Sequence, residues 1–139
     1  MINIINSFIE LVKDYNIDNV AYDYTKNYNR KQNRHYHKAY SYCDNDINKP
    51  LQALKNGLDL AIIFNVAKNK PLPKYYKLGK LKLMVVDGDK NDYIAEFRNK
   101  YPLKPIVRGL RIKFNAKDNK LKRLKVIESG LKSGFIKQA

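Results

Sequence analysis

Two histidines stand two positions apart at His35 and His37, with Tyr36 between them. Side chains alternate between the two faces of a β-strand, so a strand here would place both imidazoles on one face. Neutral imidazole is a common ligand of divalent metal ions, and this pair would supply two ligands of a metal site. The alternative is two ordinary histidines on a half-buried strand, which is our default interpretation.

The His-Tyr-His sequence resembles the metal-binding motif of rolling-circle replication initiators and relaxases. This resemblance implies a nicking endonuclease, in which a divalent ion polarises the scissile phosphate and a tyrosine attacks it. The nucleophile would be Tyr93 or one of the neighbouring tyrosines, which are Tyr75, Tyr76 and Tyr101.

Asp87, Asp89 and Asp92 form a second candidate metal site. Oxygen ligands at alternate positions open a calcium-binding loop, but that loop requires glycine and glutamate where this chain has Asp92 and Arg98. Magnesium binding by the three carboxylates stays open as an alternative. A tight turn between two strands accounts for Asp87-Gly88 without a metal, and we favour it. We therefore expect no resident metal and no cofactor.

Tyr36, Lys38, Tyr40 and Tyr42 would share one face of a strand over residues 34–42. If exposed, these rings would offer unpaired bases a stacking surface worth about 1–3 kcal/mol per base. If buried, they would fill the core beneath the opening helix. We favour burial, because tyrosine in a two-sided sheet is mostly core or half-buried. The opposite face, which carries the histidines, would then be open to partners.

The net charge of +15 at pH 7 is the strongest signal in the sequence. Residues 98–139 hold 13 Lys and Arg against two acidic residues, a net +11, whereas residues 1–97 carry +4. Lys and Arg are seldom buried, so this segment predicts a surface for an anionic partner: RNA, single-stranded DNA or a host ribonucleoprotein. The residues expected to form it are Arg98, Lys100, Lys104, Arg108, Arg111, Lys113, Lys120, Lys122, Arg123 and Lys125.

The elements that position these residues follow from the hydrophobic pattern. Helical spacing predicts an opening helix over residues 3–15, a middle helix over 46–57 and a C-terminal helix over 121–131. Strands are expected over 19–25, 34–42, 58–66, 81–86, 93–97 and 106–114, with a short strand at the end. The nearly continuous apolar run 58–66 is typical of a central strand covered on both faces. The sequence predicts one α+β domain, 1–139, with a mixed sheet of about five or six strands.

The C-terminal helix is predicted to have one apolar side and one basic side. Gly130 and Gly134 are expected to end it. The apolar residues Leu121, Leu124, Ile127 and Leu131 would face the core, and the basic residues Lys120, Lys122, Arg123 and Lys125 would point outward.

Cysteine content and apolar runs indicate the compartment. Cys43 is the only cysteine, so an internal disulfide is excluded and a reducing cytosol fits best. The N-terminus lacks the basic start and small-residue cleavage site of a signal peptide. The longest apolar stretch, residues 60–64, is too short to span a bilayer. We expect a soluble protein of the host cytoplasm that makes no membrane contact.

Short motifs along the chain resemble the C-terminal half of the phage gene product 88-like family. They lie at residues 22–26, 33–37, 60–64, 72–76, 85–89, 106–111 and 133–136. The resemblance covers roughly residues 19–136 and implies an origin in a phage or mobile element. It implies no reaction, and the cysteine-containing N-terminal half of that family has no counterpart in this sequence.

Three functional hypotheses follow. The first is a small basic phage or mobile-element protein that binds nucleic acid or a host nucleoprotein without catalysis, such as an inhibitor of a nucleic-acid-guided host defence. The second is the metal-dependent nicking enzyme that uses His35, His37 and Tyr93. The third is a virion or assembly component whose basic face meets a capsid or packaged genome.

Overall fold

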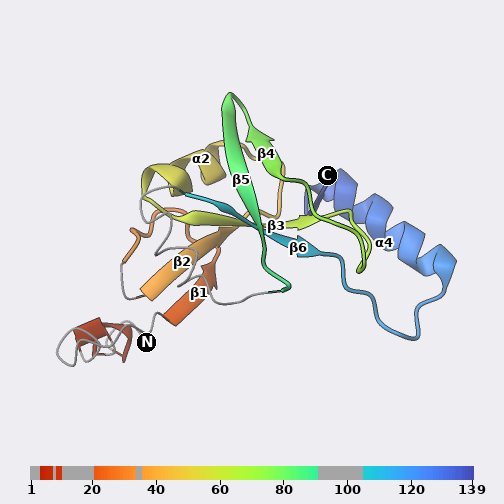
Figure 1. Cartoon of the computed structure of the whole chain (residues 1–139), viewed down its shortest axis with the longest axis horizontal. Helices are drawn as coiled ribbons and strands as arrows, with labels where there is room; N and C mark the ends of the chain where they lie inside the picture. The colour runs from red at the N-terminus through yellow and green to blue at the C-terminus, as the bar shows by residue number, and fades with distance from the viewer. Residues whose placement is uncertain (1–3, 8, 11–20, 34–35, 91–104) are drawn as a thin grey trace.

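The computed structural model describes residues 4–7, 9, 10, 21–33, 36–90 and 105–139. Its strands are β1 (Ala21–Thr25), β2 (Tyr36–Ser41), β3 (Asp59–Phe64), β4 (Tyr75–Leu78), β5 (Leu81–Asp87), β6 (Val107–Arg111) and β7 (Ile136–Lys137). The helices are α2 (Asn48–Lys55) and α4 (Lys120–Ser133), and residues 4–7 and 9–10 near the chain start are helical as well. The α+β class, with helices at the start, middle and end, is confirmed (Figure 1).

The strands form one mixed sheet in the order β1-β2-β3-β6-β5-β4. Every pair in it is parallel except β4–β5, which is an antiparallel hairpin. The apolar strand β3 is central, as predicted, with β6 along one edge. On its other edge β2 pairs with residues 59–61 and β7 pairs with residues 63–64, so the last strand continues the line of β2.

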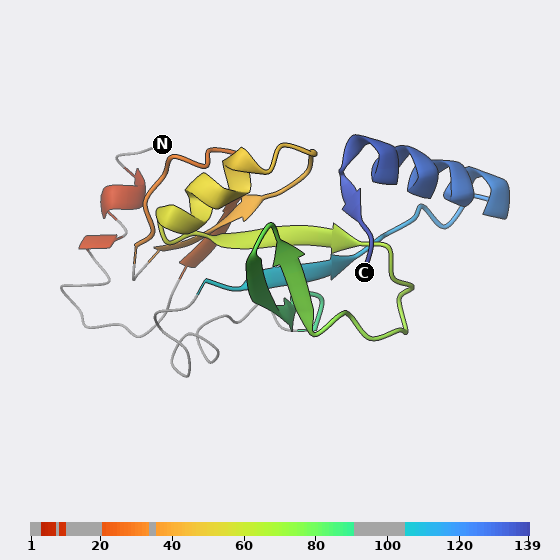
Figure 2. The same ribbon diagram turned by 90° about the horizontal axis from the view of Figure 1, so that it is seen from above.

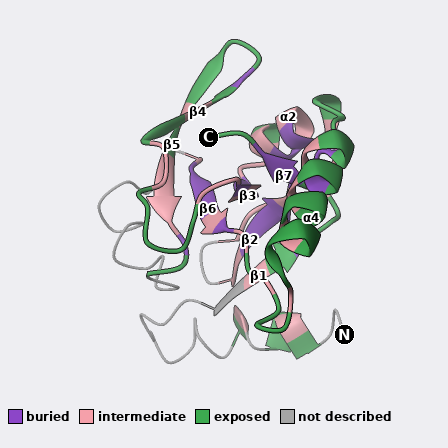
Figure 3. Cartoon of the chain, turned by 90° about the vertical axis from the view of Figure 1, so that its right-hand side faces the viewer, coloured by how far each residue is buried: buried purple, intermediate pink, exposed green. Residues whose placement is uncertain are grey.

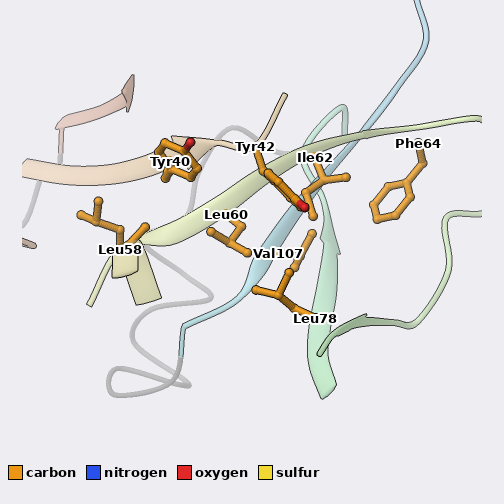
Figure 4. Packing of buried hydrophobic residues seen from close by; sticks show 9 residues of the cluster. Tyr40, Tyr42, Leu58, Leu60, Ile62, Phe64, Leu78 and Val107 are labelled. Atoms are coloured by element: carbon orange, nitrogen blue, oxygen red, sulfur yellow. The ribbon is translucent and has the colours of Figure 1, made fainter. Parts of the chain in front are cut away.

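The hydrophobic core lies between α2 and one face of the sheet, which we call the core face. Strand alternation sends Leu60, Ile62 and Phe64 of β3 to this face, and all three are fully buried. Neighbouring strands and α2 supply the other members, which are Tyr40, Tyr42, Ala53, Leu58, Leu78 and Val107 (Figure 4). Burial of this continuous cluster is the main source of stability.

Residues 26–33 carry the chain from β1 over the core face to its parallel neighbour β2 (Figure 2). The ring of Tyr28 packs edge-on against Tyr40, with centroids 6.1 Å apart. Gln32 fixes the end of this crossover: its Oε1 accepts from Lys38 N at 2.7 Å, and its own N–H donates to the Asn56 carbonyl at 3.1 Å. The predicted pairing of these two strands is confirmed, and it is parallel.

The structure gives β5 a hairpin partner that the sequence analysis did not predict. We expected residues 93–97 to return beside 81–86, but those residues lie outside the described part of the chain. In the structure β4 precedes β5 and pairs with it from Tyr75↔Met84 to Leu78↔Leu81. Gly79, with φ of 60°, occupies the turn in a conformation that favours glycine.

Candidate nucleic-acid interface

Arg111 was predicted to lie on the basic surface, and this is wrong. Its side chain is only 8% exposed and forms a bidentate ion pair with Asp87, with Nη2 2.8 Å from Oδ2 and Nη1 2.9 Å from Oδ1. Nη1 also lies 3.2 Å from Asp89, and Nε donates to the Lys70 carbonyl at 2.9 Å. Because β5 and β6 are parallel neighbours, their carboxyl ends bring these opposite charges to the same edge of the sheet.

The Asp87-Gly88-Asp89 segment forms the predicted turn. Asp87 Oδ1 accepts from the backbone N–H groups of Asp89 and Lys90, at 3.1 and 3.3 Å. Hydrogen bonds from Arg111, opposed in part by desolvation, hold the pKa of Asp87 below its usual range. Asp87 and Asp89, two of the three aspartates in the magnesium alternative, therefore already bind the Arg111 guanidinium. The third, Asp92, lies outside the described residues. Within the described chain no three His, Cys, Asp or Glu side chains gather as a metal site.

Arg108 is also buried, contrary to prediction, with 2% exposure. It points to the face of the sheet opposite the core face, since its neighbour Val107 belongs to the core. Its Nη1 donates to the Tyr24 hydroxyl on β1 at 3.0 Å, and its Cζ lies 5.2 Å from that ring centroid. Strands β2 and β3 lie between these two residues, and the small side chains of Ala39 and Ala61 leave room for the contact. Arg108 therefore makes its contacts inside the protein and does not belong to the predicted basic surface.

The nicking alternative falls largely outside the described structure, since His35 and Tyr93 are not described. His37 is half-buried on β2, on the same face as Ala39 and Tyr24. This placement leaves the metal hypothesis untested.

The tyrosine-rich face of β2 is buried, as we favoured. Tyr40 and Tyr42 are 3% and 6% exposed, and α2 contributes to their cluster. Much of the predicted opening helix lies outside the described residues. Lys38, on the same face, is buried too: its Nζ donates to the Lys31 carbonyl at 2.9 Å and lies 5.4 Å from the Tyr36 ring centroid. Desolvation lowers the pKa of Lys38. These rings do not offer a stacking surface.

The remaining basic residues gather on and beside α4. The helix begins where Asn119 caps it, accepting from Lys122 N at 2.9 Å, and it ends at Gly134, whose φ is 82°. Arg123 is half-buried over the Phe114 ring, with Cζ 5.2 Å from the centroid. Of the predicted surface residues, Lys113, Lys120, Lys122 and Lys125 are exposed. Figure 3 shows that most of α4 is exposed. Arg98, Lys100 and Lys104 lie outside the described residues.

The predicted apolar stripe of α4 is not buried as a whole, although Ile127 and Leu131 are half-buried. Leu121 and Leu124 are 62% and 53% exposed. The helix instead approaches the sheet through Gly130, where an added Cβ would lie 2.7 Å from Ile136 Cγ1. We expected Gly130 to end the helix, but α4 continues through it to Ser133, so this contact was not predicted.

A groove of about 780 Å³ separates α4 from the carboxyl end of the sheet. Its floor is aliphatic, with Ile63 of β3, Leu110 of β6 and Ile136 of β7. Residues at helical spacing on one side of α4 form its wall, and Lys113, Lys122 and Lys125 contribute ammonium groups to its lining. Phe135, which is 51% exposed, completes it. The site is therefore an apolar groove lined in part by cations, and the buried Arg111 is one of its lining residues.

Fold and site together define an α+β domain with a basic helix docked at one end of a mostly parallel sheet. No protein-family model, curated protein or solved structure that we compared with the chain matches it. No helix in the described residues combines the length and apolar character that crossing a membrane requires.

Proposed function

We propose that this protein binds nucleic acid, or the nucleic acid of a host nucleoprotein, through the surface formed by Lys113, Lys120, Lys122 and Lys125, which we call the α4 surface. The observation that carries the proposal is that these four ammonium groups are exposed on one helix and the strand end beside it. Flexible, compact cations suit phosphate contacts, which need positive charge but no exact spacing.

The distribution of exposed charge favours a binding role for the α4 surface over a basic surface that only contacts water. Two of the most basic side chains, Arg108 and Arg111, are used internally, so within the described residues 105–139 the exposed charge is concentrated on lysines around α4. Among the described residues, two of the four lysines contact acids: Lys122 lies 3.0 Å from Asp118, and Lys113 lies 3.8 Å from Asp89. Both lysines are exposed, so these ion pairs contribute little and leave the ammonium groups accessible to phosphate.

The origin in a phage or mobile element and a role against nucleic-acid-guided host defence belong to the same proposal. They rest on the small size, the basic charge and the gene product 88-like motifs. A cytoplasmic location fits a protein whose one cysteine needs no oxidising compartment.

The test is binding of a fluorescent single-stranded oligonucleotide, followed by anisotropy between about 50 and 200 mM salt. The triple variant Lys120→Gln/Lys122→Gln/Lys125→Gln should bind about tenfold more weakly. The slope of log K against log salt should become shallower by about 2, because each lost phosphate contact releases about 0.7 counterion fewer.

The matched control is Lys26→Gln/Lys31→Gln/Lys55→Gln, which removes three exposed lysines from the crossover and α2. It has the same net charge and should bind within about twofold of wild type. An equal loss in both variants would show that affinity follows total charge and would overturn the α4 surface. Binding that ignores salt would indicate a protein target.

A further inference from the structure

The β4–β5 hairpin projects from the sheet and has two chemically different faces (Figure 1). On one face Leu78, Tyr76 and Leu83 join the core, and the Tyr76 ring packs against Phe64 at 5.8 Å. The other face is exposed and consists of two cross-strand pairs, which are Tyr75 with Met84 and Lys77 with Lys82. We call these four residues the hairpin platform.

The hairpin platform exposes an aromatic ring among cations. Tyr75 is 51% exposed, and Lys82 Nζ lies 4.4 Å from its ring centroid. The sequence from residue 60 to residue 86 contains six lysines and no acidic residue. Residues 60–86 are therefore a second basic segment, which the low net charge of residues 1–97 as a whole does not reveal.

The hairpin platform and the groove beside α4 lie on the same face of the sheet. Met84 and Val86 share a face of β5, and Val86 pairs with Arg108 of β6. Leu110 follows on that face and pairs with Ile63, which pairs with Ile136. The face that carries Tyr75 is therefore continuous with the groove floor.

We propose that the hairpin platform binds the bases of a single-stranded nucleic acid, with a base stacked on Tyr75 and phosphates beside Lys77 and Lys82. This inference rests on the proposed function and names its substrate class. A base would displace the Lys82 ammonium from the ring, and an exposed cation–π contact is weaker than a base–aromatic stack. Duplex nucleic acid keeps its bases stacked within the helix, so it would meet only the lysines.

The experiment compares Tyr75→Ala, Tyr75→Leu and Tyr75→Phe for binding of a fluorescent oligouridine and a duplex of equal length. Tyr75→Ala and Tyr75→Leu should each weaken single-strand binding about tenfold, whereas Tyr75→Phe, which keeps the ring, should stay within about twofold. Duplex binding should not change. Full affinity in Tyr75→Leu would show that no base stacks there and would overturn the inference.

A second measurement is independent of variant folding. Wild-type protein irradiated with an oligonucleotide containing 4-thiouridine should give an adduct on Tyr75, located by mass spectrometry of the digested protein. Adducts confined to other residues would overturn the inference. If the α4 triple variant loses affinity while the Tyr75 variants do not, the proposed function stands and the hairpin platform fails. If neither set responds, both fail.

Discussion

Replacement of Asp87 by asparagine should lower the free energy of unfolding by about 3 kcal/mol, because it removes the charge that Arg111 binds while keeping the side chain's shape. Arg111 is 8% exposed, and both of its terminal nitrogens contact Asp87. The variant would leave this buried guanidinium with Asp89 as its remaining carboxylate. Urea unfolding at pH 7, with an unchanged m value, measures the loss.

Glu128→Gln is the matched control, because it removes one carboxylate charge from an exposed position on α4. Its effect should lie within about 0.5 kcal/mol. If Asp87→Asn cost no more than this control, the Asp87–Arg111 pair would behave as an ordinary surface ion pair.

The same pair predicts a pH dependence. Arg111 depresses the pKa of Asp87 in the folded state, so the stabilisation is present above the unfolded carboxyl pKa of about 3.9. It is lost as pH falls through the lower, folded value. The difference between wild type and Asp87→Asn should therefore be constant from about pH 7 to pH 5 and should shrink below about pH 4. A difference that grew on acidification would contradict this assignment.

The fold could be predicted where local pattern and tertiary environment agree. The apolar run of β3 indicates a doubly covered strand, and the spacing of leucines in α4 indicates a helix. The four-residue strand β4 escaped prediction because its alternation is visible only beside β5, where Tyr76 and Leu78 turn to the core while Tyr75 and Lys77 face outward.

The candidate site was predicted only in part. Charge density indicates the C-terminal third as the candidate surface, but nothing in the sequence distinguishes Arg111 from Lys113. Strand register decides the difference: it places Arg111 beside the Asp87 turn and leaves Lys113 exposed. The groove escaped prediction for the same reason, because its floor combines β3, β6 and β7, which are distant in sequence.

Substitution of Gly130 by valine should destabilise the docking of α4 by about 3 kcal/mol. Valine has a somewhat higher helix propensity than glycine, so a purely local effect would stabilise the helix. The steric effect opposes it, since an added Cβ would lie 2.7 Å from Cγ1 of the buried Ile136. The helix can accommodate valine only by moving away from β7.

This loss should be local, because α4 meets the sheet at β7 and not at the core cluster. In hydrogen exchange, protection of the α4 amides in Gly130→Val should fall about 100-fold, while the central strand β3 should keep most of its protection. Leu124→Val, at an exposed position of the helix outside the groove lining, should leave both unchanged. Equal losses in α4 and β3 would show instead that the helix is an inseparable part of the core. A selective loss would show that one glycine holds the lysines beside the groove, so Gly130→Val should also weaken oligonucleotide binding although every charge remains.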